Sequence, residues 1–187
     1  AYLDSIAPKN DKTPVSTSLN SKLVKNEADE IVEEVYHVGG LYSDAISEIV
    51  GWLKKAEKVT ETDQQAAALR RLIEYYETGN LETWDLYNVA WVNATGGDID
   101  YINGFVEVYN DPLGYTGSYE TIVQIKDFKA SQRMQVLMEN AQWFEDKSPI
   151  SDEHKKEEVV GITYNVVNVA GEAGDASPST PICVKLP

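Results

Sequence analysis

Apolar residues recur at helical spacing through the first part of the chain. Between positions 41 and 53 they form one broad stripe, which predicts an amphipathic helix. The members of this stripe are Leu41, Ala45, Ile46, Ile49, Val50 and Leu53. A sparser apolar pattern over residues 21–38, closed by Gly39-Gly40, predicts another helix just before it.

Capping signals predict two more helices. Thr62 and Gln65 form a T-x-x-Q capping box that begins one helix, and Gly79 supplies the stop that ends it. Asn80 can cap the helix that follows, on which Trp84, Tyr87 and Trp91 share one side. Residues 21–95 are therefore expected to be a helical part, after an extended lead-in over residues 1–20 that contains Pro8 and Pro14.

After Gly96-Gly97 the pattern changes to the alternation that is typical of strands. Strands are predicted over residues 99–109 and 119–125, separated by a Pro- and Gly-rich loop at 110–117. A helix at about 129–146 follows, then a polar loop at 148–158. The β-branched run 159–169 and the final residues 182–187 are predicted as strands, with a flexible connection at 170–181.

This order of elements predicts an α+β fold, because helices and strands are segregated along the chain. The expected architecture has N-terminal helices and then a β-barrel-like antiparallel sheet over residues 96–187, with the helix at 129–146 inserted. Pro187 comes directly after a strand-like run, so we expect the chain to be a fragment of a larger protein.

Composition and charge exclude several classes of protein. The 187 residues are 42% hydrophobic, and 31 acidic against 16 basic side chains leave a formal charge of −15. Nucleic acid and anionic membranes are not expected partners, because both require clustered lysine and arginine. No apolar run reaches the roughly 18 residues of a membrane span. The first residues lack the features of a signal peptide, so we expect a cytoplasmic location.

Motifs for metal or nucleophilic chemistry are missing from the sequence. Cys183 is the single cysteine, which excludes an internal disulfide, and the two histidines His37 and His154 are not at zinc-ligand spacing. No H-E-x-x-H, G-x-S-x-G or Walker A pattern occurs. We therefore expect no metal ligands in this chain.

One group of polar residues stands out among the predicted strands. Glu107 and Tyr109 alternate with apolar residues in F-V-E-V-Y, and Glu120 begins the returning strand. Antiparallel pairing would bring two carboxylates and a phenol together, where they could bind an ammonium group. The alternative is a sheet edge with solvated acids, and from the pattern alone that alternative is favoured.

The segment Y-I-N-G-F-V-E-V-Y-N-D-P-L-G at 101–114 resembles the signature of the zinc dipeptidyl-peptidase III family, metallopeptidase family M49. The stretches 39–56, 72–84, 90–93, 114–123 and 181–187 are similar to further blocks of that family in order and spacing. Members are two-lobed zinc exopeptidases that remove dipeptides from the N-terminus of short peptides. The resemblance implies that this chain is part of the barrel lobe, with one helix belonging to the other lobe.

The resemblance also implies roles for individual residues. Glu107 and Glu120 match acids that hold the peptide's ammonium group, and Tyr109 matches a catalytic tyrosine that supports the oxyanion. Asp111, Pro112 and Gly114 match a turn that sets the shape of the site. Zinc would bind the family's H-E-x-x-G-H motif, which lies beyond the matched segment, so zinc is expected only in the full-length parent.

One departure from the family keeps other functions open. Lys185 stands where the family often has an asparagine that binds the peptide, and a lysine there would repel an ammonium ligand. Besides a fragment of an active peptidase, the hypotheses are therefore a non-catalytic member that binds peptides or a partner, and an acidic domain that assembles through Trp84 and Trp91. Short peptides with a free N-terminus and the rest of the parent chain are the expected partners.

Overall fold

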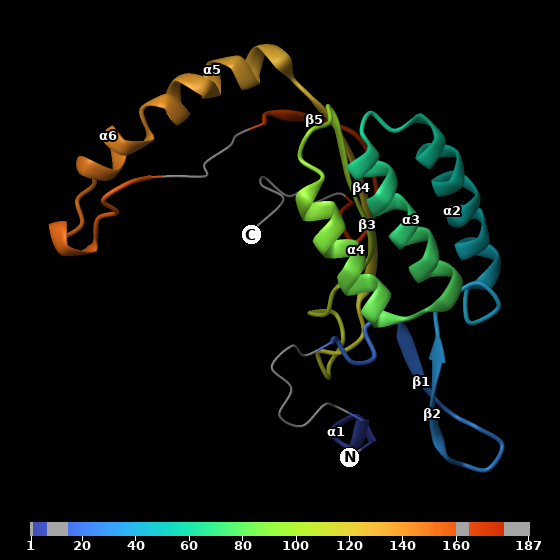
Figure 1. Cartoon of the computed structure of the whole chain (residues 1–187). Coiled ribbons are helices and arrows are strands. Elements are labelled where there is room, and N and C mark those ends of the chain that lie inside the picture. The colour runs from blue at the N-terminus through green and yellow to red at the C-terminus, as the bar shows by residue number, and fades with distance from the viewer. Residues whose placement is uncertain (1, 7–14, 160–164, 178–187) are drawn as a thin grey trace. The chain divides into compact units, whose positions relative to one another are not determined.

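The computed structural model describes residues 2–6, 15–159 and 165–177 (Figure 1). Its elements follow one another in the order α1 (Tyr2–Ile6), β1 (Ser21–Lys25), β2 (Ile31–Val35), α2 (Ser43–Ala56), η1 (Glu57–Val59), α3 (Asp63–Thr78), α4 (Leu81–Asn93), β3 (Ile99–Glu107), β4 (Ser118–Lys126), α5 (Phe128–Glu139), α6 (Ala141–Asp146), η2 (Asp152–His154) and β5 (Val167–Gly174). The predicted mixture of helices and strands is confirmed. Among these described helices, none has the length and apolar character that a membrane span requires.

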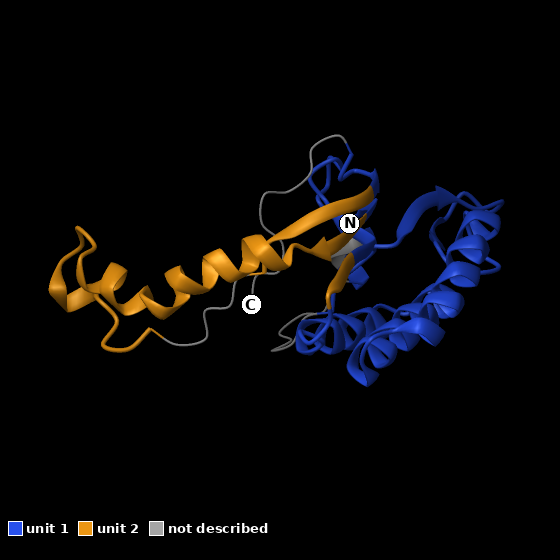
Figure 2. Ribbon diagram, turned by 90° about the horizontal axis from the view of Figure 1, so that it is seen from above, with its two compact units in different colours: residues 1–97, 102–121, 172–187 blue, residues 98–101, 122–171 orange. Residues whose placement is uncertain are grey.

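The chain divides into two compact units, which are coloured separately in Figure 2. Unit 1 contains Ala1–Gly97, Ile102–Thr121 and Glu172–Pro187, and unit 2 contains Asp98–Tyr101 and Ile122–Gly171. All the candidate site residues that the structure describes belong to unit 1.

Three helices form the core of unit 1, as the sequence predicts. Helices α2, α3 and α4 lie side by side (Figure 1), and α3 packs against both of the others. Helix α3 contributes more buried side chains than either neighbour, because its stripe faces both of them. The core side chains on these helices are Ile46, Val50, Ala68, Leu69, Leu72, Ile73, Tyr75, Tyr76, Trp84 and Tyr87.

The ends of α3 and α4 confirm the capping signals. The Thr62 hydroxyl accepts from the Gln65 amide at 3.1 Å, and the Gln65 side chain accepts from the Thr62 amide at 3.2 Å. Gly79 ends α3 in the left-handed conformation, with φ of 72°. The Asn80 side chain then accepts from the Glu82 amide at 2.7 Å and starts α4. These satisfied backbone groups fix where each helix begins and ends.

Strand β3 approaches the helices through a glycine. Trp84 of α4 is only 6% exposed, and its ring lies 4.9 Å from Tyr75 and 5.1 Å from Tyr87, centroid to centroid. A β-carbon added at Gly104 would lie 2.3 Å from Cη2 of Trp84. Glycine therefore allows the backbone of β3 to rest against the indole ring.

This contact gives a testable expectation for stability. Gly104→Ala should lower the free energy of unfolding by roughly 1–3 kcal/mol, because the added methyl group overpacks a buried ring. Gly51→Ala in α2 is the matched control, since a β-carbon there meets nothing within 4 Å. The control should stabilise the chain by about 0.5–1 kcal/mol, the usual gain in a helix interior. Urea unfolding of both variants measures the difference, and equal effects would contradict the packing described.

The predicted helix over residues 21–38 is wrong, because β1 and β2 form an antiparallel hairpin there with Leu23 opposite Glu33. The side chain of Asn26 accepts from the amides of Ala28 and Glu30 at 2.9 Å, and Asp29 takes a left-handed φ of 62°. These are turn geometries, and they divide the apolar pattern into two short strands of β-branched residues.

The lead-in before this hairpin is not extended throughout, because it contains the short helix α1. Its residues 18–20 are buried. The Asn20 carbonyl accepts from the Tyr36 amide at 2.7 Å, and the Leu19 carbonyl accepts from the Gly117 amide at 2.7 Å. The Glu33 carboxylate accepts from the hydroxyls of Ser18 and Ser21.

Strands β3, β4 and β5 form a second sheet in that order. The amide of Asp175 donates to the carbonyl of Tyr119, and the amide of Asp127 donates to the carbonyl of Val166, so partners run in opposite directions along β4 and β5. The described residues form no closed barrel, because sheets of two and three strands are too small to close on themselves. The predicted strand at 182–187 and Lys185 lie outside the described residues.

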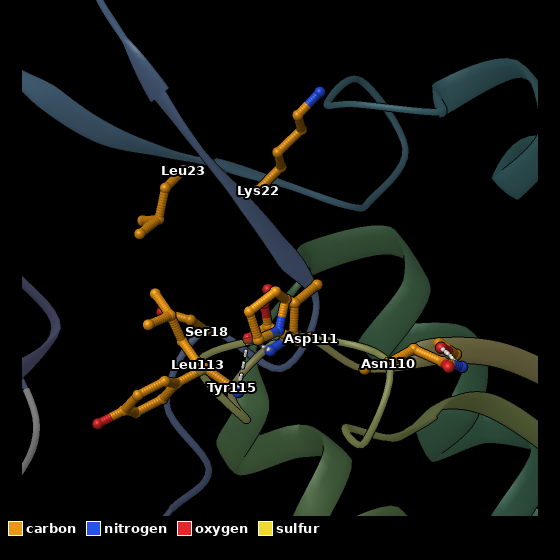
Figure 3. A pocket seen from close by; sticks show the side chains of 11 residues that line it. Ser18, Lys22, Leu23, Asn110, Asp111, Leu113 and Tyr115 are labelled. Carbon is orange, nitrogen blue, oxygen red and sulfur yellow. Dashed lines mark hydrogen bonds between the residues drawn. The ribbon is translucent and has the colours of Figure 1, made fainter.

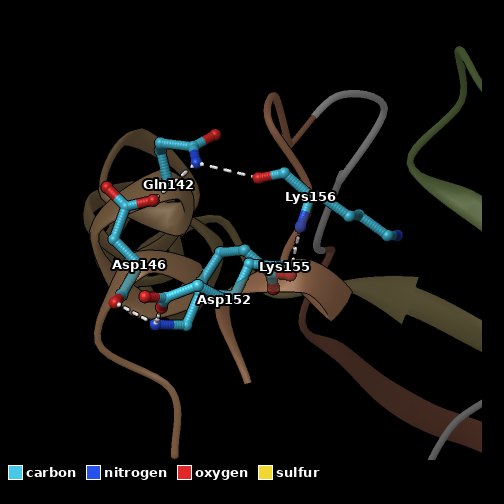
Figure 4. Close-up of polar contacts among 6 residues, drawn as sticks. Gln142, Asp146, Asp152, Lys155 and Lys156 are labelled. Carbon is cyan, nitrogen blue, oxygen red and sulfur yellow. Dashed lines mark hydrogen bonds and ion pairs between the residues drawn. The ribbon is translucent and has the colours of Figure 1, made fainter. Parts of the chain in front are cut away.

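In unit 2, the single helix predicted at about 129–146 is broken at Asn140 into α5 and α6. The loop after α6 is held by polar contacts, drawn in Figure 4: Lys155 bonds the Asp146 carbonyl at 3.0 Å and the Asp152 carboxylate at 2.6 Å. The strand predicted at 159–169 instead begins at Val167 and continues to Gly174, through part of the expected flexible connection. Residues 160–164 of that prediction lie outside the described residues.

Candidate functional site

The predicted acids lie on neighbouring strands of the second sheet. Glu107 is the last residue of β3 and is exposed, whereas Glu120 lies near the start of β4 and is only 8% exposed. The two carboxylates are close enough to repel each other, and both act electrostatically on the phenol of Tyr109. The structure therefore brings together the three side chains that the hairpin argument paired.

A fourth polar residue joins them from β5. Asp175, one residue beyond that strand, accepts the hydroxyl proton of Tyr109 on Oδ2 and a hydrogen bond from Asn110 Nδ2 on Oδ1, the latter at 3.0 Å. Asn110 Nδ2 also lies 3.1 Å from the Ser118 hydroxyl oxygen, to which it donates. We call Glu107, Tyr109, Glu120 and Asp175 the acidic cluster.

The backbone at Gly174 brings Asp175 to this position. Gly174 has a φ of 71°, and a β-carbon there would lie 2.1 Å from the Tyr119 carbonyl oxygen. The Asp175 amide donates to that same carbonyl at 2.9 Å. Only glycine permits this close approach, so the end of β5 is fixed directly beside β4 and the acidic cluster.

Two members of the acidic cluster, Glu120 and Tyr109, have raised pKa values. Burial, followed by the charges of Glu107 and Asp175, raises the pKa of Glu120 above its ordinary value. The hydrogen bond to Asp175 is the main cause that raises the pKa of Tyr109 to about 12. The Glu120 carboxylate makes no hydrogen bond or ion pair within the part of the chain that the structure describes. A bound cation would relieve this repulsion.

The loop after β3 has the geometry that its sequence predicts. The Asp111 carboxylate accepts from the amides of Tyr115 at 2.8 Å and Thr116 at 3.1 Å, which lowers the pKa of Asp111. Gly114 takes a φ of 70°, and its amide donates to the Asp111 carbonyl at 3.0 Å, while Pro112 is exposed between them. These contacts hold the ends of the loop together and orient the residues that follow Tyr109.

A pocket of about 410 Å³ lies between this loop and β1, and Figure 3 shows the side chains that line it. Asn110 and Ser118 belong to both its wall and the hydrogen bonds around Asp175. The pocket therefore adjoins the acidic cluster through Asn110. The lining residues are Ser18, Lys22, Leu23, Asn110, Asp111, Pro112, Leu113, Tyr115, Thr116, Gly117 and Ser118.

Sequence reasoning missed Asp175, which it placed in a flexible connection. The available signal was the alternation of Val167 and Val169, which continues as strand to Gly174, followed by a glycine–aspartate pair. That signal gains meaning only when β5 pairs with β4, which no local pattern specifies.

Comparisons with known proteins show which family the chain belongs to. The model of the family described as "Peptidase family M49" matches residues 7–181, nearly the whole chain. The chain belongs to peptidase family M49. This is the dipeptidyl-peptidase III family, and the resemblance of the 101–114 segment is thereby confirmed.

The curated relatives that this M49 chain matches are much longer than the chain itself. Dipeptidyl peptidase 3 of Homo sapiens is 24% identical over 140 residues, which is 75% of this chain and 19% of the relative. Nudix hydrolase 3 of Arabidopsis thaliana is 26% identical over 162 residues, 79% of this chain and 20% of the relative. The chain thus spans about a fifth of the length of these proteins.

Solved structures show the same fold as this M49 chain. DPP III from Caldithrix abyssi matches with a TM-score of 0.68 and 20% identity, covering 85% of this chain and 30% of that one. Dipeptidyl-peptidase III from Corallococcus sp. strain EGB matches with a TM-score of 0.60 and 18% identity, covering 87% and 29%.

M49 is a family of zinc metallopeptidases. Within the described residues, no group of three or more His, Cys, Asp or Glu side chains is arranged to bind a metal ion. His37 directs Nδ1 to the Val38 carbonyl at 2.7 Å, and the His154 side chain is 73% exposed beside Glu153. These residues do not fit a zinc site.

Proposed function

We propose that this chain binds the free amino end of short peptides, as the peptide-binding part of a zinc dipeptidyl-peptidase that removes dipeptides from the N-terminus. The observation that carries the proposal is the buried carboxylate of Glu120, which lies beside Glu107 and Asp175 without a cationic partner among the described residues. Membership of family M49 supports the substrate class.

The chemistry of the acidic cluster suits an ammonium group. Carboxylates accept hydrogen bonds and carry negative charge, and a peptide's amino terminus offers three donors and one positive charge. Such charge-assisted hydrogen bonds are about twice as strong as neutral ones. An N-acetylated peptide lacks the charge and two of the donors, so the cluster distinguishes free from blocked peptides.

The hydrolytic chemistry belongs to residues outside this chain in our proposal. The zinc ligands would come from an H-E-x-x-G-H motif elsewhere in the parent protein, whose remaining part is the expected partner of this chain. Tyr109 is the catalytic residue that the family resemblance assigns here. We place the parent protein in the cytoplasm.

Glu107→Gln tests the amine role directly. The variant should bind tetra-alanine roughly tenfold more weakly, because it removes one charge-assisted hydrogen bond at an exposed position. Binding of N-acetyl-tetra-alanine should not change, and calorimetric titration of the 187-residue chain measures both. Glu27→Gln, an exposed glutamate of the β1–β2 turn, is the matched control. Equal losses for the two peptides would reject the ammonium role.

The second candidate function is a non-catalytic peptide- or partner-binding protein of the same family. Lys185, in place of a peptide-binding asparagine, is the feature that favours it. The two functions differ in the full-length protein. An active peptidase releases dipeptides from tetra-alanine, whereas the non-catalytic member binds the peptide without turnover.

A further inference from the structure

The direction of one hydrogen bond in the acidic cluster has a consequence for peptide recognition. The hydroxyl of Tyr109 has one proton, and it donates that proton to Asp175 Oδ2. The hydroxyl oxygen keeps its two lone pairs, so it can accept further hydrogen bonds but has no proton left to donate. Toward any other group Tyr109 is therefore an acceptor, for as long as its hydroxyl donates to Asp175.

Asp175 also accepts a hydrogen bond on its other carboxylate oxygen. Asn110 Nδ2 donates to Oδ1 of Asp175 at 3.0 Å, so both carboxylate oxygens receive a hydrogen bond. The backbone holds the carboxylate in place as well, since the Asp175 amide is bonded to the Tyr119 carbonyl and Gly174 allows the close approach. Asp175 therefore connects the residues just after β3 to the end of β5.

We propose that Asp175 is a positioning residue of the amine site. By accepting a hydrogen bond from the Tyr109 hydroxyl, it leaves the phenol oxygen as an acceptor for the ammonium group. Glu107 and Glu120 bind the same ammonium group. This inference rests on the proposed function. It adds a residue outside the predicted hairpin, and it gives Tyr109 a role in binding the amine. An oxyanion role for Tyr109 would require its bond to Asp175 to break first.

The charges around the phenol agree with this role. The titratable groups that act on Tyr109 are Asp175, Glu107 and Glu120, and all three raise its pKa. No basic side chain forms an ion pair with these acids within the described residues. All four members of the acidic cluster can accept a hydrogen bond, so a donor-rich cation fits the cluster and an anion does not.

Asp175→Asn tests the inference because an amide has one accepting oxygen and one donating nitrogen. The amide cannot accept from both Asn110 and Tyr109, so when its nitrogen faces Tyr109 the hydroxyl proton turns toward the amine site. Tetra-alanine should then bind roughly tenfold more weakly. In a Tyr109→Phe background the same substitution should cost threefold or less, because only the general loss of charge remains. Equal losses in the two backgrounds would overturn the positioning role.

A second readout needs no peptide. The ultraviolet absorbance of tyrosinate, taken as the difference between a chain and its Tyr109→Phe variant, follows the titration of Tyr109 alone. Its pKa should fall from about 12 toward the ordinary value of 10.0 in Asp175→Asn. An unchanged titration would overturn the inference. Asp175→Glu, which keeps the charge but displaces the carboxylate, should weaken binding in the same direction and serves if Asp175→Asn does not fold.

The outcomes separate this inference from the proposed function. Asp29→Asn at the β1–β2 turn is the control, because it removes one exposed carboxylate where asparagine suits the left-handed backbone. If the unsubstituted chain does not bind tetra-alanine, the proposed function and this inference both fail. If it binds, and Asp175→Asn weakens binding equally with and without the Tyr109 hydroxyl, only the positioning role fails.

Discussion

Trp84→Ala is expected to lower the free energy of unfolding by about 3–5 kcal/mol, the usual cost of truncating a buried tryptophan. Trp84 is 6% exposed and contacts the rings of Tyr75 and Tyr87. Its removal leaves a cavity between α3, α4 and the glycine backbone of β3. Because protein interiors are close-packed and relax only in part, we expect little collapse and therefore a large loss.

Urea unfolding followed by circular dichroism measures this loss. Trp52→Ala is the matched control, since Trp52 of α2 is 65% exposed and has Lys55 over its ring at 3.8 Å. That substitution should cost about 1 kcal/mol or less. Comparable losses at the two tryptophans would mean that Trp84 is not part of the core.

Glu120→Gln is expected to weaken binding of tetra-alanine by roughly a hundredfold while it stabilises the peptide-free chain. Truncating one member of a buried charge pair with a ligand typically costs about 2–5 kcal/mol. In the peptide-free chain the same carboxylate is 8% exposed and unpaired among the described residues, so its ionised form is unfavourable. A neutral amide should therefore raise the unfolding free energy near neutral pH, on the order of 1 kcal/mol.

The pH dependence of this stabilisation follows from the raised pKa of Glu120. The folded chain retains the proton at pH values where the unfolded chain has lost it, so stability falls as pH rises from the unfolded pKa through the folded one. Below the ordinary value of 4.5 the carboxyl is protonated in both states, and Glu120→Gln should have little effect from this source.

Urea unfolding at a series of pH values, together with calorimetric titration of tetra-alanine, checks both parts. Glu27→Gln on the exposed turn should change neither quantity by a comparable amount. A gain in stability without a loss of peptide binding would show that Glu120 is buried but does not bind the amine.

The elements that the sequence predicts correctly depend on local interactions. The box formed by Thr62 and Gln65, the stop at Gly79 and the cap at Asn80 each satisfy backbone groups within a few residues, so the sequence alone places these ends. The pairing of the two strands that carry Glu107 and Glu120 was also predictable, since a short Pro- and Gly-rich loop between two alternating segments favours antiparallel pairing.

The incorrect predictions concern segments whose apolar pattern fits both a helix and strands. Val24, Ile31 and Val35 fit a helix stripe, but they fit two strands equally well once the chain turns at Asn26. The turn decides between the two, because the Asn26 side chain bonds two backbone amides. Weighing that asparagine and the β-branched residues together would have favoured strands.

The candidate site was predictable only in part for a different reason. Glu107 and Glu120 lie on consecutive strands, and Tyr109 follows the first of them by two residues, so pairing rules bring the three together. Asp175 arrives from β5, and its approach depends on the pairing of β5 with β4 and on the left-handed Gly174. Contacts between distant segments leave no local signal in one sequence.

The bond between Tyr109 and Asp175 joins positions that are 66 residues apart in the chain. Contacts of this separation carry a large loop-closure cost and form late, whereas the turns of α3 and α4 close between near neighbours. The helices can therefore assemble before the last strand docks. The proposed binding of an amine would then be among the last properties that a newly made chain acquires. A break in the chain between α5 and β5 would remove this binding while the helices stay folded.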